Sequence, residues 1–406
     1  MTETLPAGAE PILLAFSGGL DTSFCVPWLK ETYDRPVITL TVDTGGIDAE
    51  AARVLEERSA ALGAERHVLI DARDAYFERV LKYLVMGNVR RGQLYPLCVG
   101  AERVMQAQIL AERAREFGTS VVAHGCTAAG NDQVRFEVAL RTLAPGLTVL
   151  APVRDRAFKR PEQLAFLEER GLPIPPWGAA YSVNRGLWGV TIGGKETLTS
   201  EGSIPEDAWV LSRTAFTEPA EPERHVVGFE RGVPASLDGE AFAPVALIER
   251  IESIGAKFGV GRGIHVGDTI IGTKGRVAFE APAAHVLIEA HRELEKLVLT
   301  ARQQRIKDTV AAPYGDLVHE GQHLDPVCRD IEALLESSQS RVSGAVHVLY
   351  RPGSAFIEGV TSPHSLMAAS KGIYGEAAGE WTPADALGFS KMLSLTGSFW
   401  HRAGGE

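Results

Sequence analysis

A loop of seven residues, Ser17-Gly18-Gly19-Leu20-Asp21-Thr22-Ser23, is the part of this chain best suited to chemistry. The apolar run at residues 12–16 before it predicts a short buried strand, and residues 24–30 after it predict the first turns of a helix. In that setting the glycines let backbone N–H groups gather around an anion, and the helix dipole adds to the attraction. Because the loop lacks the lysine of a Walker motif, it favours pyrophosphate over a transferring γ-phosphate. Asp21 could orient the loop or face a metal.

A second polar segment, residues 124–137, reads HGCTAAGNDQVRFE, and its second half predicts a helix that begins near Asp132. Asn131 and Arg135 are four residues apart and would share one helix face with Asp132. Arg135 could hold a carboxylate or a ureido oxygen with two hydrogen bonds, Asp132 could bind an ammonium group, and Thr127 offers a hydroxyl. A capped helix start with a surface arginine is the alternative interpretation of this segment.

The composition limits the classes of function. A chain of 406 residues predicts two or more domains, and a net charge of −11 argues against a general nucleic-acid or membrane binder, although it allows a local basic pocket. Four widely spaced cysteines form no C-x-x-C pair, which indicates free thiols in a reducing cytoplasm. The polar N-terminus and the absence of an 18-residue apolar run predict neither a signal peptide nor a transmembrane helix.

The elements that must position these loops alternate between strand and helix in the first part of the chain. Strands are predicted at residues 12–16, 37–42, 65–70, 121–124 and 147–152, and helices at 48–62, 74–86 and 101–117. This is the pattern of an α/β fold with a doubly wound parallel sheet. Ligands of such sheets bind beyond the carboxyl ends of the strands, so the loops at 17–23, 43–46 and 125–132 should converge there.

The composition of the sequence changes near residues 160–177, and the rest predicts an α+β domain. A helix at 161–170 and a rigid proline-rich turn come first; an extended segment at 224–229 and helices at 243–258 and 283–299 follow. Paired strands are predicted at 341–350 and 354–359, and a helix-rich tail at 386–406. We therefore expect a nucleotide-binding domain at 1–165, a synthetase and multimerisation domain at 166–365, and a C-terminal arm at 366–406.

Together the two loops closely resemble those of the argininosuccinate synthase family, a branch of the pyrophosphate-loop ATP pyrophosphatases with an adenine-nucleotide hydrolase-like sheet. Weaker matches run along nearly the whole chain, at Ala151-Pro152, Gly171-Leu172-Pro173-Ile174-Pro175, Tyr181-Ser182-Val183, Gly259-Val260-Gly261-Arg262, Gly272-x-Lys274-x-Arg276 and Gly388-Phe389. The resemblance implies an ATP-dependent ligase that adenylates the ureido oxygen of citrulline, releases pyrophosphate, and lets the aspartate amine displace AMP. It also implies a role in arginine biosynthesis, Mg²⁺ bound with ATP, no structural metal, and a homotetramer.

The resemblance further implies a role for each matched residue. ATP would be bound by Ala15, Phe16, Ser17, Gly18, Gly19, Leu20, Asp21, Thr22, Ser23, Val42 and Gly125. Aspartate would be bound by Thr127, Asn131 and Asp132. Citrulline would be bound by Asn131, Arg135, Ser182 and Thr191, the last a threonine where the family has serine. No side chain needs to act as a covalent nucleophile, so catalysis would come from alignment and charge stabilisation.

The chain departs from the family pattern at the amino-acid end of the citrulline site. Its tyrosine and serine correspond to Leu94 and Val99, its glutamate and second tyrosine to Gly267 and Phe279, and a lysine of the second loop to Ala129. Two explanations are open. Other residues, for instance Arg90, Arg91 or Arg185, supply the missing charges, or the substrate is a citrulline whose α-amine is acylated and therefore neutral.

Three other motifs are interpreted as structural. His319-Glu320-Gly321-Gln322-His323 matches the zinc-protease pattern H-E-x-x-H, but its glycine and the following proline argue against a zinc-binding helix. Residues 189–195 nearly match a Walker loop and are expected to form a plain loop, and residues 259–263 lack the third glycine of a dinucleotide fingerprint. Two rival functions stay open: another pyrophosphate-loop enzyme, such as a tRNA thiolase, and a nucleotide-binding protein that has lost activity.

Overall fold

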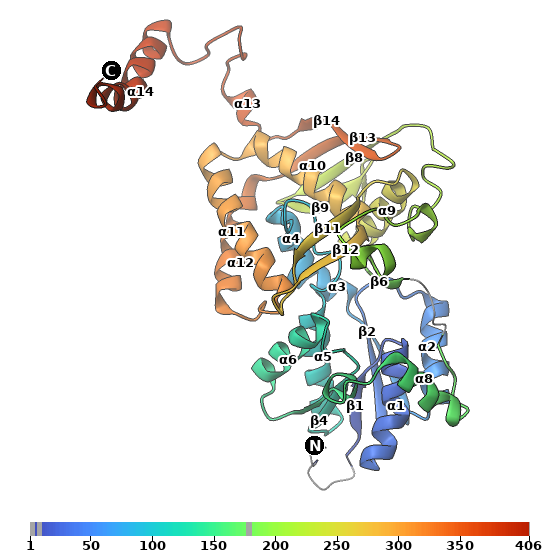
Figure 1. Cartoon of the computed structure of the whole chain (residues 1–406). Helices are drawn as coiled ribbons and strands as arrows, with labels where there is room; N and C mark the ends of the chain where they lie inside the picture. The colour runs from blue at the N-terminus through green and yellow to red at the C-terminus, as the bar shows by residue number, and fades with distance from the viewer. Residues whose placement is uncertain (1–4, 6–9, 176–180, 406) are drawn as a thin grey trace.

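The computed structural model describes residues 5, 10–175 and 181–405. Figure 1 shows an N-terminal and a C-terminal lobe stacked on one another, and a helical arm that extends from the C-terminal lobe. Among the described residues, the helices are all too short or too polar to cross a membrane.

The N-terminal lobe is built on a five-stranded sheet in the order β3-β2-β1-β4-β5, and each paired strand in it is parallel. Its strands are β1 (Ile12–Ala15), β2 (Val37–Asp43), β3 (Arg66–Asp71), β4 (Val121–His124) and β5 (Thr148–Leu150). The chain winds from β1 outward to β3 and then returns to β4 on the other side of β1. This confirms the predicted doubly wound sheet, and the change of direction places a ligand crevice at the carboxyl ends of β1 and β4.

Helices cover both faces of this sheet (Figure 1). Ile12 and Leu14 of β1 pack in one apolar cluster with α1 and α8, whereas Leu13 between them packs in another with α5 and α6. That alternation follows from the two-residue period of a strand. The helices are α1 (Leu20–Tyr33), α2 (Ala49–Ala61), α5 (Arg103–Glu116), α6 (Asp132–Leu143), α7 (Pro152–Asp155) and α8 (Arg160–Glu169).

The helix predicted at residues 74–86 is confirmed, with one π-helical turn inside it. The segment consists of α3 (Arg73–Tyr76), one π-helical turn η1 (Phe77–Leu81) and α4 (Lys82–Met86). Its side chains Tyr76, Leu84 and Met86 belong to the large apolar core of the C-terminal lobe, with residues of α10 (Pro282–Val298) such as Leu287. This part of the N-terminal half of the chain therefore packs in the other lobe.

The C-terminal lobe contains two antiparallel sheets, which agrees with the predicted α+β organisation. The five-stranded sheet has the order β10 (Glu240–Ala241), β9 (Val233–Leu237), β8 (Glu223–Glu230), β13 (Gly344–Arg351) and β14 (Ser354–Thr361). The four-stranded sheet has the order β11 (Arg262–Asp268), β12 (Lys274–Glu280), β7 (Gly189–Gly193) and β6 (Ser182–Gly186). The predicted pair of strands near the end of the chain is confirmed by the β13–β14 ladder.

Of two glycine-rich segments noted in the sequence, residues 189–195 differ from the plain loop expected there, whereas residues 259–261 form a turn. Residues 189–193 form the buried strand β7, because Val190 and Ile192 fill a small core under the four-stranded sheet. Gly259 and Gly261, with φ of 67° and 79°, form the tight turn between α9 (Pro244–Lys257) and β11. Neither segment joins a strand to a helix as a nucleotide loop does.

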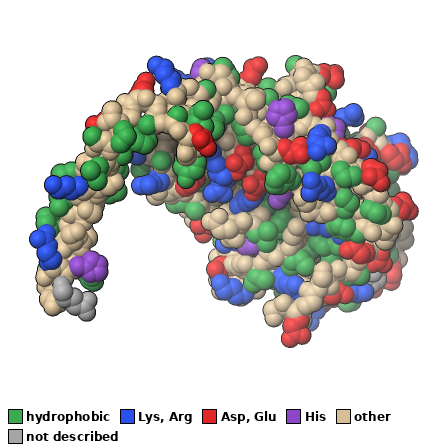
Figure 2. All heavy atoms as spheres, turned by 90° about the horizontal axis from the view of Figure 1, so that it is seen from above, with side chains coloured by type: hydrophobic (Ala, Val, Ile, Leu, Met, Phe, Trp, Pro, Cys, Tyr) green, Lys and Arg blue, Asp and Glu red, His purple; other side chains and the backbone are tan. Residues whose placement is uncertain are grey.

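The remaining helices of this lobe are α9 (Pro244–Lys257), α10 (Pro282–Val298), α11 (Ala301–His319) and α12 (Pro326–Ser338), with short turns η2 (Lys195–Leu198), η3 (Glu206–Ala208) and η4 (Gln339–Arg341). After β14, α13 (Leu366–Ala369) leads into α14 (Pro383–Ala403), which confirms the predicted helical tail. Figure 2 shows this arm curving away from the body. No residue of α14 is buried, and Leu393 and Trp400 are 70% and 74% exposed.

Candidate active site

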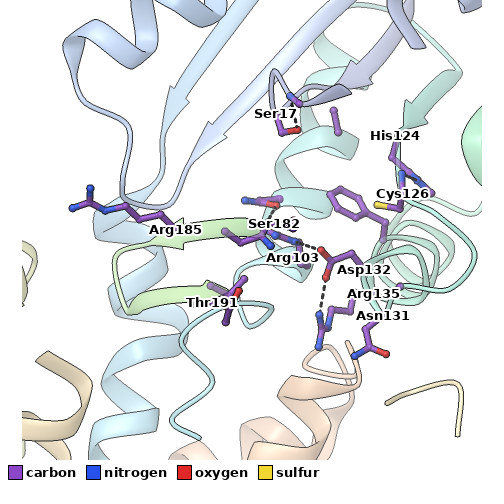
Figure 3. Close-up of a pocket in the computed structure, with 18 of the residues that line it drawn as sticks. Ser17, Arg103, His124, Cys126, Asn131, Asp132, Arg135, Ser182, Arg185 and Thr191 are labelled. Carbon is purple, nitrogen blue, oxygen red and sulfur yellow. Dashed lines mark hydrogen bonds and ion pairs between the residues drawn. The ribbon is translucent and has the colours of Figure 1, made fainter. Parts of the chain in front are cut away.

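A pocket of about 950 Å³ lies between the carboxyl edge of the parallel sheet and the four-stranded sheet of the other lobe. Both loops singled out in the sequence line it, together with residues of β6, β7, β11 and β12 (Figure 3). The two lobes therefore build one cavity between them, with the glycine-rich loop at one end.

The loop after β1 has the geometry of an anion site. Gly18 has φ of 72°, and a β-carbon there would lie 2.5 Å from Leu55 of α2, so the turn requires glycine. Gly19 caps α1 without a side-chain hydrogen bond, which leaves the first-turn N–H groups without helical acceptors. The loop is braced from α2, where Arg58 Nη1 donates to the Gly18 carbonyl at 2.6 Å.

The residues expected to bind ATP divide into a lining group and a supporting group. Gly18 and Ser23 support the loop, since the buried Ser23 hydroxyl donates to the Gly18 carbonyl at 3.5 Å. Leu20, at the start of α1, also lies behind the lining, packed against the apolar cluster under that helix. Those that line the pocket are Ala15, Phe16, Ser17, Gly19, Asp21, Thr22, Val42 and Gly125.

The second loop closes against the first. A β-carbon at Gly125 would lie 2.9 Å from the Thr22 side chain, so the two loops touch through a glycine. Thr127 and Asn131 line the pocket beyond this contact. Asn131 Oδ1 accepts the backbone N–H of Ile270 at 2.9 Å, which ties the loop to the turn between β11 and β12.

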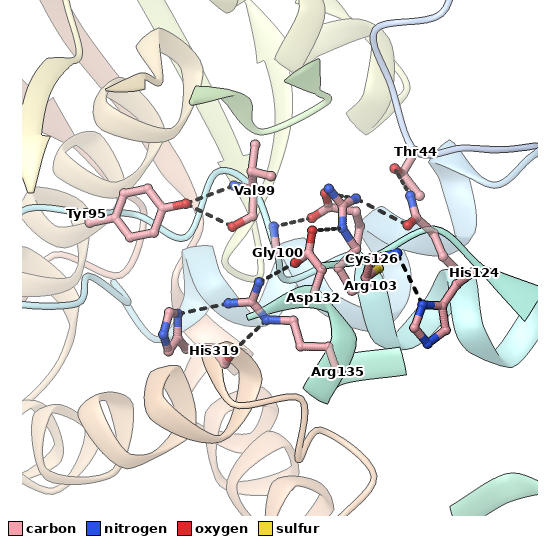
Figure 4. Close-up of polar contacts among 12 residues, drawn as sticks. Thr44, Tyr95, Val99, Gly100, Arg103, His124, Cys126, Asp132, Arg135 and His319 are labelled. Carbon is pink, nitrogen blue, oxygen red and sulfur yellow. Dashed lines mark hydrogen bonds and ion pairs between the residues drawn. The ribbon is translucent and has the colours of Figure 1, made fainter. Parts of the chain in front are cut away.

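Asp132, at the start of α6, is held between two arginines (Figure 4). Arg103 Nε donates to its Oδ2 at 2.9 Å, and Arg135 Nη1 donates to its Oδ1 at 2.6 Å. Burial by itself would raise the pKa of Asp132, but the two guanidinium groups outweigh it and hold the pKa well below the usual range. The carboxylate therefore stays ionised and fixed in orientation at the centre of the pocket.

Arg103 and Arg135 each hold a second partner. Arg103 Nη1 also binds the buried carboxylate of Glu102 at 2.7 Å. Arg135 crosses to the other lobe, where its Nε donates to the His319 carbonyl at 2.8 Å and its Nη2 to His319 Nδ1 at 3.2 Å. Arg135 is thus a buried bridge between α6 and the end of α11 as well as a pocket residue.

The H-E-x-x-H segment does not form a zinc-binding helix. Helix α11 ends at His319, and Gly321 has φ of 78°, so the two histidines do not share a helix face. His319 lines the pocket, whereas His323 Nε2 contacts Tyr314 and Glu332 at 3.3 Å and 3.1 Å inside the lobe. The two imidazoles therefore have separate surroundings.

Both residues expected from the four-stranded sheet, Ser182 on β6 and Thr191 on β7, line the pocket, and Thr191 is 8% exposed. Phe279 pairs with Thr191 across the β12–β7 ladder and is buried. Leu94, by contrast, is 45% exposed and lies outside the lining. Its neighbour Tyr95 lines the pocket, as does Val99, the position assigned to the family serine.

The three arginines considered for a substrate carboxylate differ in placement. Arg90 pairs with Glu289 away from the pocket. Arg185 is 48% exposed and bound to Glu252, and Figure 3 shows it pointing away from Asp132. Arg91 lines the pocket with its side chain 18% exposed. Arg185 is nevertheless part of the pocket lining as well, so Arg91 and Arg185 both border the cavity and Arg91 is the more buried of the two.

Sequence reasoning missed four residues of the site: Arg103, Tyr95, His265 and His319. None of them belongs to a motif to which the sequence assigns a ligand, and the sequence points to His319 only through the zinc-protease pattern. The buried Glu102-Arg103 pair within an otherwise apolar helix start is the one local signal that could have indicated Arg103.

Comparisons with known proteins match both halves of the chain to one family. The family model of the arginosuccinate synthase N-terminal HUP domain matches residues 11–173, and that of the arginosuccinate synthase C-terminal domain matches residues 181–400. An argininosuccinate synthase of Xanthomonas campestris is 40% identical over 401 residues, which are 97% of this chain and 98% of the relative.

Other organisms supply similar relatives. An argininosuccinate synthase of Methanocaldococcus jannaschii is 38% identical over 354 residues, 87% of this chain and 89% of the relative. One of Rubrobacter xylanophilus is 36% identical over 394 residues, 97% of this chain and 95% of the relative. With both halves matched by their own models and relatives aligned over almost their full length, the chain belongs to the argininosuccinate synthase family of ATP-dependent C–N ligases.

Proposed function

We propose that the chain performs its family's reaction in the pocket between the lobes. ATP, citrulline and aspartate give argininosuccinate, AMP and pyrophosphate. The observation that carries this assignment is the shared cavity, in which a helix-start anion loop at one end faces a charged cluster at Asp132 and Arg135. Such an arrangement can hold a triphosphate and two amino acids side by side.

In the first step the ureido oxygen of citrulline attacks the α-phosphorus of ATP, and the bond to the β-phosphate breaks to release pyrophosphate. The loop at residues 17–23 binds the leaving pyrophosphate through backbone N–H groups and the hydroxyls of Ser17 and Thr22. Arg135 faces the ureido group. The main catalytic contribution of these residues is alignment together with stabilisation of the negative charge that develops on the leaving group.

In the second step the aspartate amine attacks the activated ureido carbon, and AMP leaves with the ureido oxygen. Thr127, Asn131 and Asp132 bind aspartate. A carboxylate accepts about four hydrogen bonds, so Asp132 retains capacity for an ammonium group after its contacts to Arg103 and Arg135. The contacts to the two arginines fix the orientation of the Asp132 carboxylate, and so the direction from which an ammonium group can bind to it.

Mg²⁺ enters with ATP in this proposal. The Asp21 carboxylate lines the pocket beside the anion loop, and the described residues contain no cluster of three or more His, Cys, Asp or Glu suited to a resident metal. One carboxylate plus phosphate oxygens is a usual environment for Mg²⁺. The ion would neutralise charge on the pyrophosphate.

We also propose a cytoplasmic homotetramer with the domain limits 1–165, 166–365 and 366–406. The exposed apolar side chains of α14, which include Leu387, Phe389 and Met392, support assembly through the arm. The four free cysteines and the biosynthetic reaction support a cytoplasmic location.

The test is pyrophosphate release in the presence of ATP, citrulline and aspartate. Asp21→Ala should reduce the rate at least 100-fold, about 2.7 kcal/mol of activation free energy, with an unchanged melting temperature. Asp330→Ala, at an exposed position of α12, is the matched control and should leave the rate unaltered. A rate in Asp21→Ala within threefold of wild type would contradict the assignment.

A further inference from the structure

The segment at residues 319–323, which carries the zinc-protease pattern, lies against Arg135 where α11 ends. Its first histidine accepts hydrogen bonds from Arg135, and its glycine packs against the stem of that side chain. Its second histidine points elsewhere, to Tyr314 and Glu332. Half of this segment therefore serves a pocket residue of the other lobe, which its sequence pattern does not indicate.

The Arg135 side chain is packed against two glycines that have no room for a side chain of their own. A β-carbon at Gly321 would lie 2.9 Å from Arg135 Cα and 3.1 Å from its Cγ. One at Gly100 would lie 2.7 Å from Arg135 Nη1 and 2.8 Å from its Cζ. The two glycines have φ of 78° and 104°, which other residues rarely adopt. Backbone thus confines the stem of Arg135 at Gly321 and its guanidinium group at Gly100.

His319 accepts two hydrogen bonds from the same guanidinium group (Figure 4). Arg135 Nε donates to the His319 carbonyl at 2.8 Å, and Nη2 donates to His319 Nδ1 at 3.2 Å. Because a guanidinium can only donate, Nδ1 is the nitrogen without hydrogen, and the ring hydrogen lies on Nε2, which is buried beside the backbone of Asp268. Burial, with Arg135 and Arg91 nearby, lowers the pKa of His319 to about 3, so the ring stays neutral and Nδ1 remains an acceptor.

These contacts leave a defined part of Arg135 for a ligand. Its Nη1 donates to Asp132 Oδ1 at 2.6 Å, so three of the five N–H groups of the guanidinium are occupied and two remain among the described residues, one on each terminal nitrogen. A side chain whose orientation is fixed before binding loses less entropy when the ligand arrives. The contacts of Arg135 therefore influence how tightly those two N–H groups bind a substrate.

We propose that His319, Gly321 and Gly100 form a socket that positions Arg135 for the ureido substrate, and that Nδ1 of His319 is the part of the socket that fixes the guanidinium. The proposal rests on the proposed function, in which Arg135 binds citrulline, and the three residues act through Arg135. Asp132 keeps its contact with Arg103 when the socket is impaired, so aspartate binding should be spared. The defect should appear in KM for citrulline.

Two amide substitutions separate the roles of the two ring nitrogens of His319. In His319→Asn the amide oxygen takes the place of Nδ1 and still accepts from Arg135, whereas in His319→Gln the longer side chain brings its amide to the place of Nε2. KM for citrulline in pyrophosphate release should stay within threefold of wild type in the first and rise at least tenfold in the second, about 1.4 kcal/mol. In both, kcat and KM for ATP and aspartate should stay within threefold. A residue that only fills space would give the opposite order, since glutamine is closer in size to histidine.

His323 provides the matched control, because it belongs to the same segment, is 7% exposed like His319, and contacts Glu332 inside the lobe. His323→Asn and His323→Gln should leave all three KM values within threefold, whatever they cost in melting temperature. His319→Leu, which has the shape of asparagine without its acceptor, should match His319→Gln and replaces it if that chain does not fold. An asparagine variant as impaired as the glutamine variant, a rise in KM shared by all three substrates, or an unaltered KM for citrulline in His319→Gln would overturn the proposal.

The proposed function fails separately, if the folded wild-type chain releases no pyrophosphate with ATP, citrulline and aspartate. Crystal structures of the two amide variants then test the socket without activity. Arg135 Nη2 should contact the side chain at position 319 in His319→Asn and lose that contact in His319→Gln. The contact present in both variants, or in neither, would overturn the role of Nδ1.

Discussion

Arg103 should be the side chain that keeps the acidic centre of the pocket stable and oriented, and Arg103→Met tests this. The guanidinium pairs with Glu102, whose side chain is 4% exposed, and with Asp132, whose side chain is 36% exposed. Removing one partner of a buried ion pair costs about 3–5 kcal/mol. Asp132 retains Arg135 and contact with pocket water, so we expect a loss of about 2–4 kcal/mol in the free energy of unfolding.

Urea unfolding followed by tryptophan fluorescence measures this loss. The double variant Glu102→Gln/Arg103→Met tests whether the unpaired buried charge of Glu102 is its cause. The amide oxygen of the introduced glutamine can still accept the backbone N–H of Gly100 that Glu102 binds at 2.7 Å, but the side chain leaves no buried charge. The double variant should therefore recover about half of the lost stability.

A kinetic readout separates orientation from stability. Without Arg103 the Asp132 carboxylate loses one of its two anchors, so KM for aspartate should rise about tenfold while KM for ATP changes less than threefold. An Arg103→Met chain within 0.5 kcal/mol of wild type, or a double variant as unstable as the single one, would refute the reasoning.

Three further predictions concern the histidines and the arm. Burial holds the pKa of His124 near 4 and that of His319 near 3, whereas the unfolded chain binds these protons near pH 6.5, so the free energy of unfolding should fall as the pH drops from 7 to 5. In urea unfolding measured at several pH values, His319→Gln should remove about 1–2 kcal/mol of that fall. An unaltered dependence of stability on pH in this variant would contradict the prediction. Metal analysis should find no stoichiometric zinc, and a zinc-selective chelator should leave activity unaltered with Mg²⁺ in excess, because His319 and His323 face different partners; one zinc held by both would overturn this. A chain ending at residue 365 should form an assembly of fewer subunits than the full chain by light scattering, and a tetramer of the shortened chain would exclude the arm from assembly.

The pattern of neighbouring residues was sufficient to predict the anion loop and the parallel sheet. The loop at residues 17–23 needs only glycines between an apolar strand and a helix start, and both features are visible in neighbouring residues. The same holds for the start of α6 at Asp132 and for the β13–β14 hairpin, because their periodicity and turn residues lie within a few positions of one another. The family resemblance likewise rests on contiguous motifs.

Only the tertiary structure decided how the charges of the site are paired. Arg103 meets Asp132 across 29 positions of the chain, and Arg135 meets His319 across 184, distances over which no local period carries information. The pocket also combines Arg91, His265 and His319 from three separate segments, and the contact of Tyr95 rather than Leu94 with the pocket depends on the turn of one loop. Sequence determines which residues are available; the packing of two lobes against each other determines which of them share a cavity, because burial and charge compensation act between residues that meet only in the folded chain.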